Sequence, residues 1–184
     1  MNQIGGTLRA WAGVEVVRGR PARRTVALAA AVVATALSAH VAVPLPFTPV
    51  PMTLQPLMVL LAGLVLGPRL GATAMVAYVA LGAAGAPVFS NGHGGLAWLL
   101  GPTGGYLLAY PAAAFAAGAL AGSARAGAVR LFLAGVAGVA VLYAGGVSQL
   151  VLVTGQPVAR ALALGAVPFL FGDLLKVLIA LVVA

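Results

Sequence analysis

Two long stretches of this 184-residue chain contain no charged side chain. Residues 25–68 hold no Asp, Glu, Lys or Arg, and neither do residues 70–124. The second stretch is long enough for two membrane spans of about 20 residues with a hairpin between them. Only 7% of all residues are charged, whereas about 25% is usual in a soluble domain, and the mean hydropathy is +1.12. The chain is therefore predicted to be an integral membrane protein.

Prolines, glycines and polar clusters divide the apolar sequence into six predicted transmembrane helices. These helices span approximately 25–43, 53–66, 69–86, 105–122, 128–154 and 162–184. The arginines predict the orientation, because cytoplasmic segments carry an excess of basic residues. If both termini are cytoplasmic, eight of the nine Arg lie inside and only Arg160 lies outside. We predict an all-α bundle of six transmembrane helices with cytoplasmic N and C termini, composed of a basic tail (1–24) and a transmembrane domain (25–184).

Several other classes of protein are disfavoured by the same sequence. The net charge of +8 does not indicate nucleic-acid binding, because the basic residues concentrate in the tail and at breaks between apolar runs. A secretory signal over residues 1–39 is an alternative, but its basic and apolar regions are both too long. The chain has no Cys, and neither His has a Glu or Cys at ligand spacing. Without a catalytic or phosphate-binding motif, we expect no enzyme activity, metal or cofactor.

Two segments between the predicted helices are irregular. Residues 44–51 contain four prolines, so this segment is predicted to be extended. We expect it to fold into the outer half of the bundle, where irregular backbone must pack on protein or line a cavity; a plain tight connector is the alternative. Residues 87–105 are rich in glycine. There we predict a short amphipathic turn at 96–100 over the mouth of the bundle, followed by Thr103 as the cap of the next helix.

Asp173 and Lys176 are ionisable residues inside the last apolar segment. Because they are three residues apart, their side chains lie on the same face of a helix. A helix that begins at Leu162 places Asp173 near the midplane of the membrane, whereas one that begins around Pro168 makes the site shallower. A charge inside the membrane costs at least a few kcal/mol and marks a functional site by default. An ion pair that only fixes helix packing is the alternative.

Other candidates have weaker signals. Ala30 and Ala34 lie on a stripe of small residues along the first helix, which would suit a partner protein or packing inside the bundle. Trp98 is expected at the outer membrane interface. The four tyrosines are either walls of a pocket or aromatic residues of the interface belt. They are Tyr78, Tyr106, Tyr110 and Tyr143.

Three motifs, in this order, resemble the BioY family, the biotin-binding S components of energy-coupling-factor (ECF) vitamin transporters. They are PLPFTPVPMTLQ at 44–55, GPTGGY at 101–106 and FGDLLK at 171–176. The resemblance runs from the first to the sixth predicted helix and implies an S-component-like bundle whose outer loops close over a pocket. It implies that Asp173 and Lys176 form the polar end of a biotin site. Further contacts would come from Thr48, Gln55 and Asn91, with Tyr143 stacked on the ring system of the ligand.

The resemblance also implies the partners. Biotin is the transported ligand, taken up across the cytoplasmic (inner) membrane of a bacterium, and the coupling partners are a transmembrane T protein and two ATPase subunits. A homo-oligomer is left open. The alternatives are an S component for another vitamin and a stand-alone membrane channel or scaffold. A channel would show a continuous polar stripe through several helices, which this sequence lacks outside its last helix.

Overall fold

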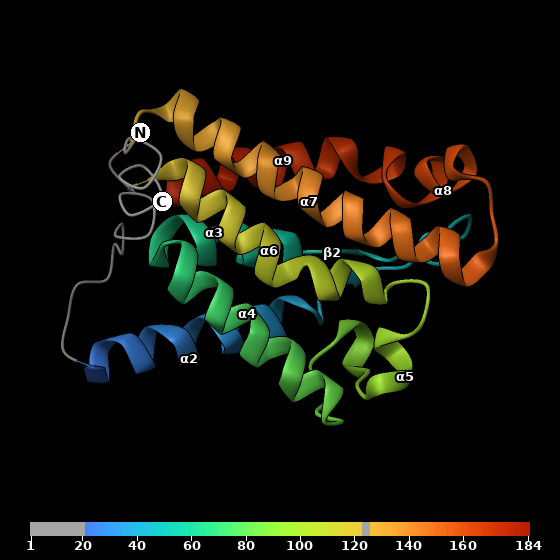
Figure 1. Cartoon of the computed structure of the whole chain (residues 1–184), viewed down its shortest axis with the longest axis horizontal. Helices are drawn as coiled ribbons and strands as arrows, with labels where there is room; N and C mark the ends of the chain where they lie inside the picture. Colours follow the sequence, from blue (N-terminus) through green and yellow to red (C-terminus); the bar gives the residue numbers. More distant parts are fainter. Residues whose placement is uncertain (1–20, 123–125) are drawn as a thin grey trace, which may run out of the picture.

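The computed structural model describes residues 21–122 and 126–184, so most of the predicted basic tail and Arg125 lie outside the described residues. Within the described part, six helical segments run roughly along the long axis of the molecule (Figure 1). They are α2 (Pro21–Ser38), α3 (Gln55–Leu66), α4 (Pro68–Ala83), α6 (Gly104–Ala121), α7 (Ala128–Thr154) and a final segment made of α8 (Val158–Gly165) and α9 (Leu170–Val183).

Three of these segments are long and apolar enough to cross a membrane: α6, α7 and the segment Val158–Val183. The α3 helix, in contrast, has only 12 residues, which is about 18 Å of helix against a hydrocarbon core of about 30 Å. The fold is therefore mostly helical with membrane-spanning capacity, as predicted. The short α3 leaves part of the membrane depth to the irregular segment that precedes it.

The centre of the bundle is α6, which packs against α3, α4 and α7. The contact with α3 is close because both helices present glycine there. A Cβ atom added to Gly118 would lie 2.6 Å from the carbonyl oxygen of Gly63, and one added to Gly63 would overlap the carbonyl of Ala114. Small residues at such crossings let the backbones of membrane helices approach each other. This packing fixes α3 and α6 as a rigid frame.

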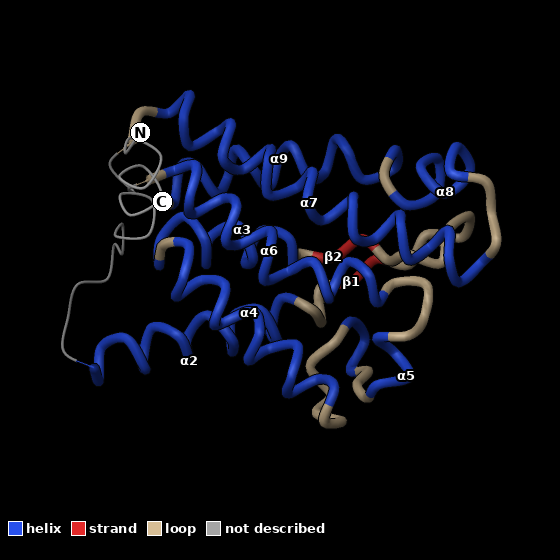
Figure 2. The backbone as a smooth tube through the Cα atoms, in the orientation of Figure 1, coloured by secondary structure: helices blue, strands red, loops and turns tan. Residues whose placement is uncertain are grey.

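The first helix ends earlier than predicted. It stops at Ser38 and not at residue 43, and the chain then forms a small antiparallel hairpin of β1 (Ala42–Val43) and β2 (Met52–Thr53). Figure 2 shows these strands beside the helical bundle. The four prolines lie between the strands or at their edge, where no ladder N–H is needed. The segment is not helical, as predicted, but it is not extended throughout, because residues 46–47 form a turn and residues 49–50 a bend. The pairing of its two ends was not predicted.

The last helix is broken, so the prediction of one continuous helix over 162–184 is wrong. The 3₁₀ turn η2 (Val167–Phe169) separates α8 from α9. Pro168 lies in this turn, and its ring and missing N–H disfavour a continuous α-helix here. Asp173 consequently lies in the first turn of α9. Of the two predicted helix starts, the one around Pro168 is the nearer to the observed start of α9 at Leu170.

The glycine-rich loop before α6 contains two short elements, η1 (Ser90–Gly92) and α5 (Leu96–Leu99). The α5 helix confirms the short turn predicted at 96–100. Thr103 occupies the N-cap position of α6, but its hydroxyl makes no capping hydrogen bond. The prediction of a capping role for Thr103 is therefore wrong.

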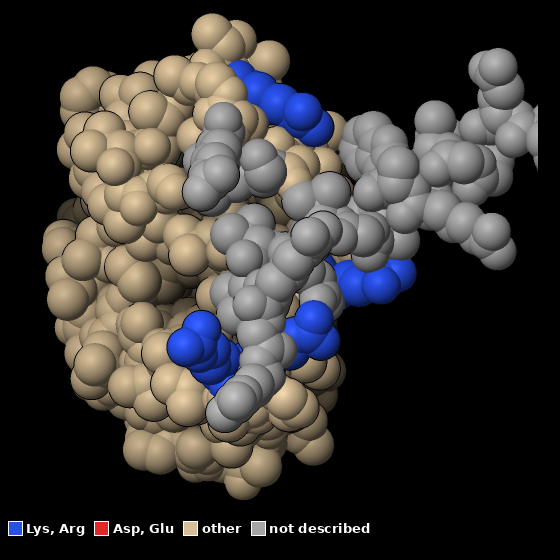
Figure 3. Space-filling view, turned by 90° about the vertical axis from the view of Figure 1, so that its left-hand side faces the viewer, with Lys and Arg blue, Asp and Glu red and all other residues tan. Residues whose placement is uncertain are grey.

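Basic side chains gather at the end of the molecule where α2 begins and α9 ends. Four of the five Arg in the described ranges belong to helix starts at this end: Arg23, Arg24, Arg69 and Arg130. Figure 3 looks onto this end and shows Lys and Arg side chains with no acidic side chain among the described residues on that face. Along α2, Thr35 and Ala39 are buried against the bundle, whereas Ala30 is exposed and Ala34 is half-buried.

Candidate functional site

A cavity opens between the β1–β2 hairpin, the loop with η1 and α5, and the helices α6, α7 and α9. About 590 Å³ of space between the atoms lies here, including the open space at its mouth. The hairpin and the start of α3 supply residues 50–53 and 55–56, and the loop supplies Ser90 and Trp98. All three motifs singled out in the sequence therefore meet at one cavity.

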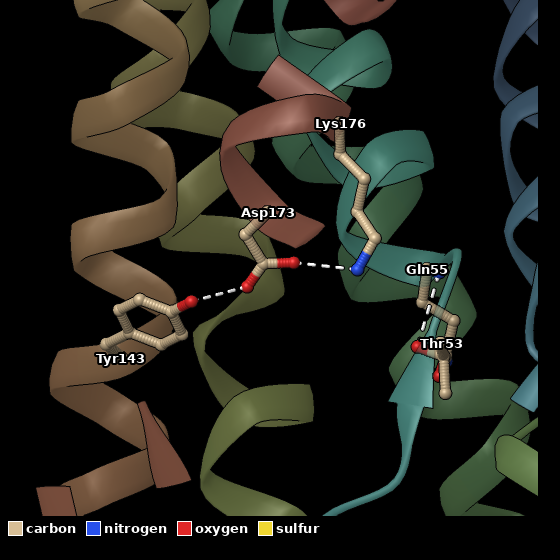
Figure 4. Close-up of polar contacts among 5 residues, drawn as sticks. All are labelled: Thr53, Gln55, Tyr143, Asp173 and Lys176. Atoms are coloured by element: carbon tan, nitrogen blue, oxygen red, sulfur yellow. Dashed lines mark hydrogen bonds and ion pairs between the residues drawn. The ribbon is translucent and has the colours of Figure 1, made fainter. Parts of the chain in front are cut away.

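The charged residues of the cavity are Asp173 and Lys176. The Nζ atom of Lys176 lies 2.7 Å from Oδ1 of Asp173, and the hydroxyl of Tyr143 donates a hydrogen bond of 2.6 Å to Oδ2 (Figure 4). Asp173 is 4% exposed and Lys176 is 6% exposed. Burying such a pair is costly unless geometry and further hydrogen bonds compensate it, and Tyr143 supplies one such bond. The pair is neutral as a whole while Lys176 retains N–H donors for a ligand.

Gln55 begins α3 and lines the cavity. Its Nε2 donates to the hydroxyl of Tyr78 at 2.7 Å, and that hydroxyl donates to the carbonyl of Val88 at 2.6 Å. This chain of hydrogen bonds fixes the side-chain amide, so its Oε1 is the atom left to accept a hydrogen bond. The backbone N–H of Gln55 donates to Oγ1 of Thr53, which also holds the end of β2 at the cavity (Figure 4).

Aromatic side chains form much of the remaining wall. Tyr106, Tyr110 and Tyr143 line the cavity, and Tyr78 stacks behind Tyr110 with ring centroids 6.0 Å apart. The structure thus supports the pocket-wall interpretation for three of the four tyrosines, whereas Tyr78 is fully buried and does not line the cavity. Trp98 also lines the cavity and stacks on His93 with ring centroids 3.9 Å apart, and its place at the outer interface stays a prediction.

Two of the six predicted site residues do not line the cavity. Thr48 donates a hydrogen bond of 2.8 Å to the carbonyl of Leu164, so it attaches the hairpin loop to α8. Asn91 is exposed and has a φ of 58°, while its neighbour Ser90 is buried and lines the cavity. The geometry thus brings together four predicted residues, which are Asp173, Lys176, Gln55 and Tyr143.

Sequence reasoning missed Ser90, and it left Tyr110 without a definite role. A signal for Tyr110 was available, because Tyr106 and Tyr110 are four residues apart and therefore share one face of α6. Together the lining residues offer an apolar, aromatic surface with hydroxyl, amide and paired ionic groups at a few positions. Such a surface suits a small ligand with a polar head and an apolar body.

Comparisons with known proteins identify a family, similar sequences and a similar fold. The model of the BioY family matches residues 10–184. The chain is 43% identical over 136 residues to the "Probable biotin transporter BioY" of Pyrococcus horikoshii, covering 74% of this chain and 79% of that protein. It is 43% identical over 140 residues to the "Biotin transporter BioY" of Thermotoga maritima, covering 76% and 82%. The crystal structure of the S-component for biotin from an ECF-type ABC transporter superposes with a TM-score of 0.80 at 26% identity, over 90% of this chain and 92% of that chain.

Proposed function

The chain belongs to the BioY family, and on this basis we propose that it binds biotin and takes it up across the membrane as the substrate-specific component of an ECF-type transporter. One structural observation carries the proposal. The three motif segments enclose a single cavity around the buried pair of Asp173 and Lys176. Biotin is supported as the ligand because the two relatives are named biotin transporters and the superposed structure is that of an S-component for biotin.

The chemistry of the cavity fits biotin. The ureido group of biotin has two N–H donors and one strongly polar carbonyl, while its sulfur ring and valeryl chain are apolar. Asp173 would accept from a ureido N–H, and Lys176 would donate to the carbonyl. Val50, Leu142 and Phe169 line the cavity and would pack on the apolar parts. The ion pair is compensated by its own members when the site is empty, and it exchanges partners with the ligand when the site is loaded.

The proposal extends to topology and partners. Six spans, including the short α3 with its hairpin, would place the arginine-rich end and both termini in the bacterial cytoplasm, with residues 1–24 as a basic tail and residues 25–184 as the substrate-binding domain. The positive-inside rule supports this orientation. The energy for uptake would come from a transmembrane T protein and two ATPase subunits, and the exposed Ala30 with Ala34 beside it would be a docking face for them.

Calorimetric titration of the purified full chain in detergent or nanodiscs tests the function. We expect saturable binding of biotin and no binding of thiamin at the same concentrations. Binding of thiamin and not of biotin would assign the chain to another vitamin. If neither vitamin binds to folded protein, the function is wrong, and a channel or scaffold becomes the better description.

A further inference from the structure

The hydroxyl group of Tyr110 points to an additional contact with the ligand. Tyr110 is 3% exposed and lines the cavity, yet its hydroxyl has no hydrogen-bond partner within the described ranges 21–122 and 126–184. Every fully buried side-chain nitrogen or oxygen among these residues has a partner, so this hydroxyl must be open to the cavity. Because it is open to the cavity, this hydroxyl can donate and accept hydrogen bonds with a molecule that occupies the cavity.

Tyr110 is the lining residue farthest along α6. Along α6 the cavity is lined by Thr103, then Tyr106 and then Tyr110, and the last of these lies about 10 Å beyond the first at the helical rise of 1.5 Å per residue. On the other wall, Lys176 is the lining residue farthest along α9, and Gln55 is the first residue of α3. Tyr110, Lys176 and Gln55 thus face one shared cavity from three different helices, α6, α9 and α3.

The next residue along α6 contributes to the same polar environment. Pro111 follows Tyr110 inside the helix, and it has no N–H to donate to the carbonyl of Leu107. Leu107 also lines the cavity. One turn of α6 thus combines a hydroxyl without a partner and a carbonyl that lacks its usual helical donor.

From these contacts we propose that Tyr110 is a specificity-determining residue that hydrogen bonds to the ureido head of biotin from α6, while Asp173 and Lys176 bind it from α9. This inference rests on the proposed function. A ureido group both donates and accepts, as a phenol hydroxyl does. The carboxylate of the ligand is a poor match for the neighbourhood of the ion pair, because the only cation among the described lining residues, Lys176, is already paired and an uncompensated buried charge is costly. The valeryl carboxylate therefore lies toward the mouth.

Tyr110→Phe tests the contact, with Tyr78→Phe as the matched control. Both variants remove one phenol hydroxyl, but that of Tyr78 has two hydrogen bonds inside the protein. Titrations use biotin and its methyl ester, which keeps the ureido group and lacks the negative charge. Melting curves of the ligand-free proteins accompany each titration.

We expect Tyr110→Phe to weaken the binding of biotin and of its methyl ester by the same factor. This factor should be about three- to ten-fold, because one neutral hydrogen bond is lost. Its ligand-free melting temperature should be equal to or above that of the wild type, whereas Tyr78→Phe should melt lower. Unchanged biotin affinity in Tyr110→Phe overturns the contact, and so does a loss confined to biotin, which would place the hydroxyl at the carboxylate. Failure of the wild type to bind biotin overturns the proposed function itself, and the two failures are thus distinguishable.

Discussion

Replacing Asp173 by Asn tests whether the buried ion pair binds the ligand or only holds the last helix in place. The substitution keeps the shape of the side chain and removes its negative charge. In the structure the carboxylate engages both of its oxygens, one with Lys176 and one with Tyr143. The Asn variant leaves the ammonium of Lys176 buried without a counter-charge and weakens the acceptor that a ureido N–H would use.

The expected loss of biotin affinity follows from the number of charged hydrogen bonds that the substitution removes. One charged hydrogen bond contributes about 1.5–3 kcal/mol, so Asp173→Asn should reduce biotin affinity by about ten- to hundred-fold. Lys176→Met should cost a similar amount. The double variant should cost less than the sum of the two, because residues that share a 2.7 Å contact act as one network.

The assay is a double-mutant cycle of biotin affinity in detergent or nanodiscs, with the melting temperature recorded for each protein. If the pair only fixes helix packing, the single variants will melt lower and yet bind biotin as the wild type does. Wild-type affinity in folded Asp173→Asn protein would refute the assignment of the site to α9.

Three further predictions concern other parts of the fold. Replacing residues 49–51 by Gly-Ser-Gly should weaken biotin binding, because the prolines reduce the entropy cost of ordering the loop; unchanged affinity in correctly inserted protein would contradict this. Ala30→Leu should impair transport, measured by biotin uptake, or assembly with the coupling subunits, measured by co-purification, while biotin still binds. The control Ala31→Leu, at a residue packed against the core, should lower the melting temperature. Gly63→Ala should also lower the melting temperature, because the added Cβ overlaps the backbone of α6 across the helix contact. The control Gly127→Ala has open space around its added Cβ and should melt at the wild-type temperature. Equal melting temperatures of the two variants would show that this crossing tolerates a side chain.

The parts of the site that depend on local helix geometry were predictable from the sequence. Asp173 and Lys176 are three residues apart, and any helix places such residues on one face. Their environment was also predictable, because a charged pair in an apolar segment has few alternatives to a buried, mutually paired state. The place where the last helix breaks was less clear, since Pro168 is compatible with the first turn of a helix as well as with a kink.

The parts that depend on backbone handedness or on distant contacts could not be predicted. Asn91 takes the left-handed conformation at φ 58°, so the loop presents Ser90 to the cavity and leaves Asn91 exposed. No local pattern indicates which of two adjacent polar residues in a glycine-rich loop faces inward. Thr48 bonds to a carbonyl 116 residues away in the chain, and such a pairing follows only from the assembled fold.

Two side chains donate hydrogen bonds to neighbouring carbonyls at the end of α8, and these bonds affect the rates of ligand entry and escape. Thr48 binds the carbonyl of Leu164, and Tyr106 binds that of Gly165 at 2.6 Å. At about 0.5–1.5 kcal/mol each, these two bonds add roughly 1–3 kcal/mol to the cost of separating α8 from the hairpin loop and α6, which lowers the fraction of open molecules by about 5- to 150-fold. If the same two bonds persist in the loaded protein, they slow entry and escape of the ligand by a common factor. They then set the residence time of the ligand and leave its equilibrium affinity unchanged.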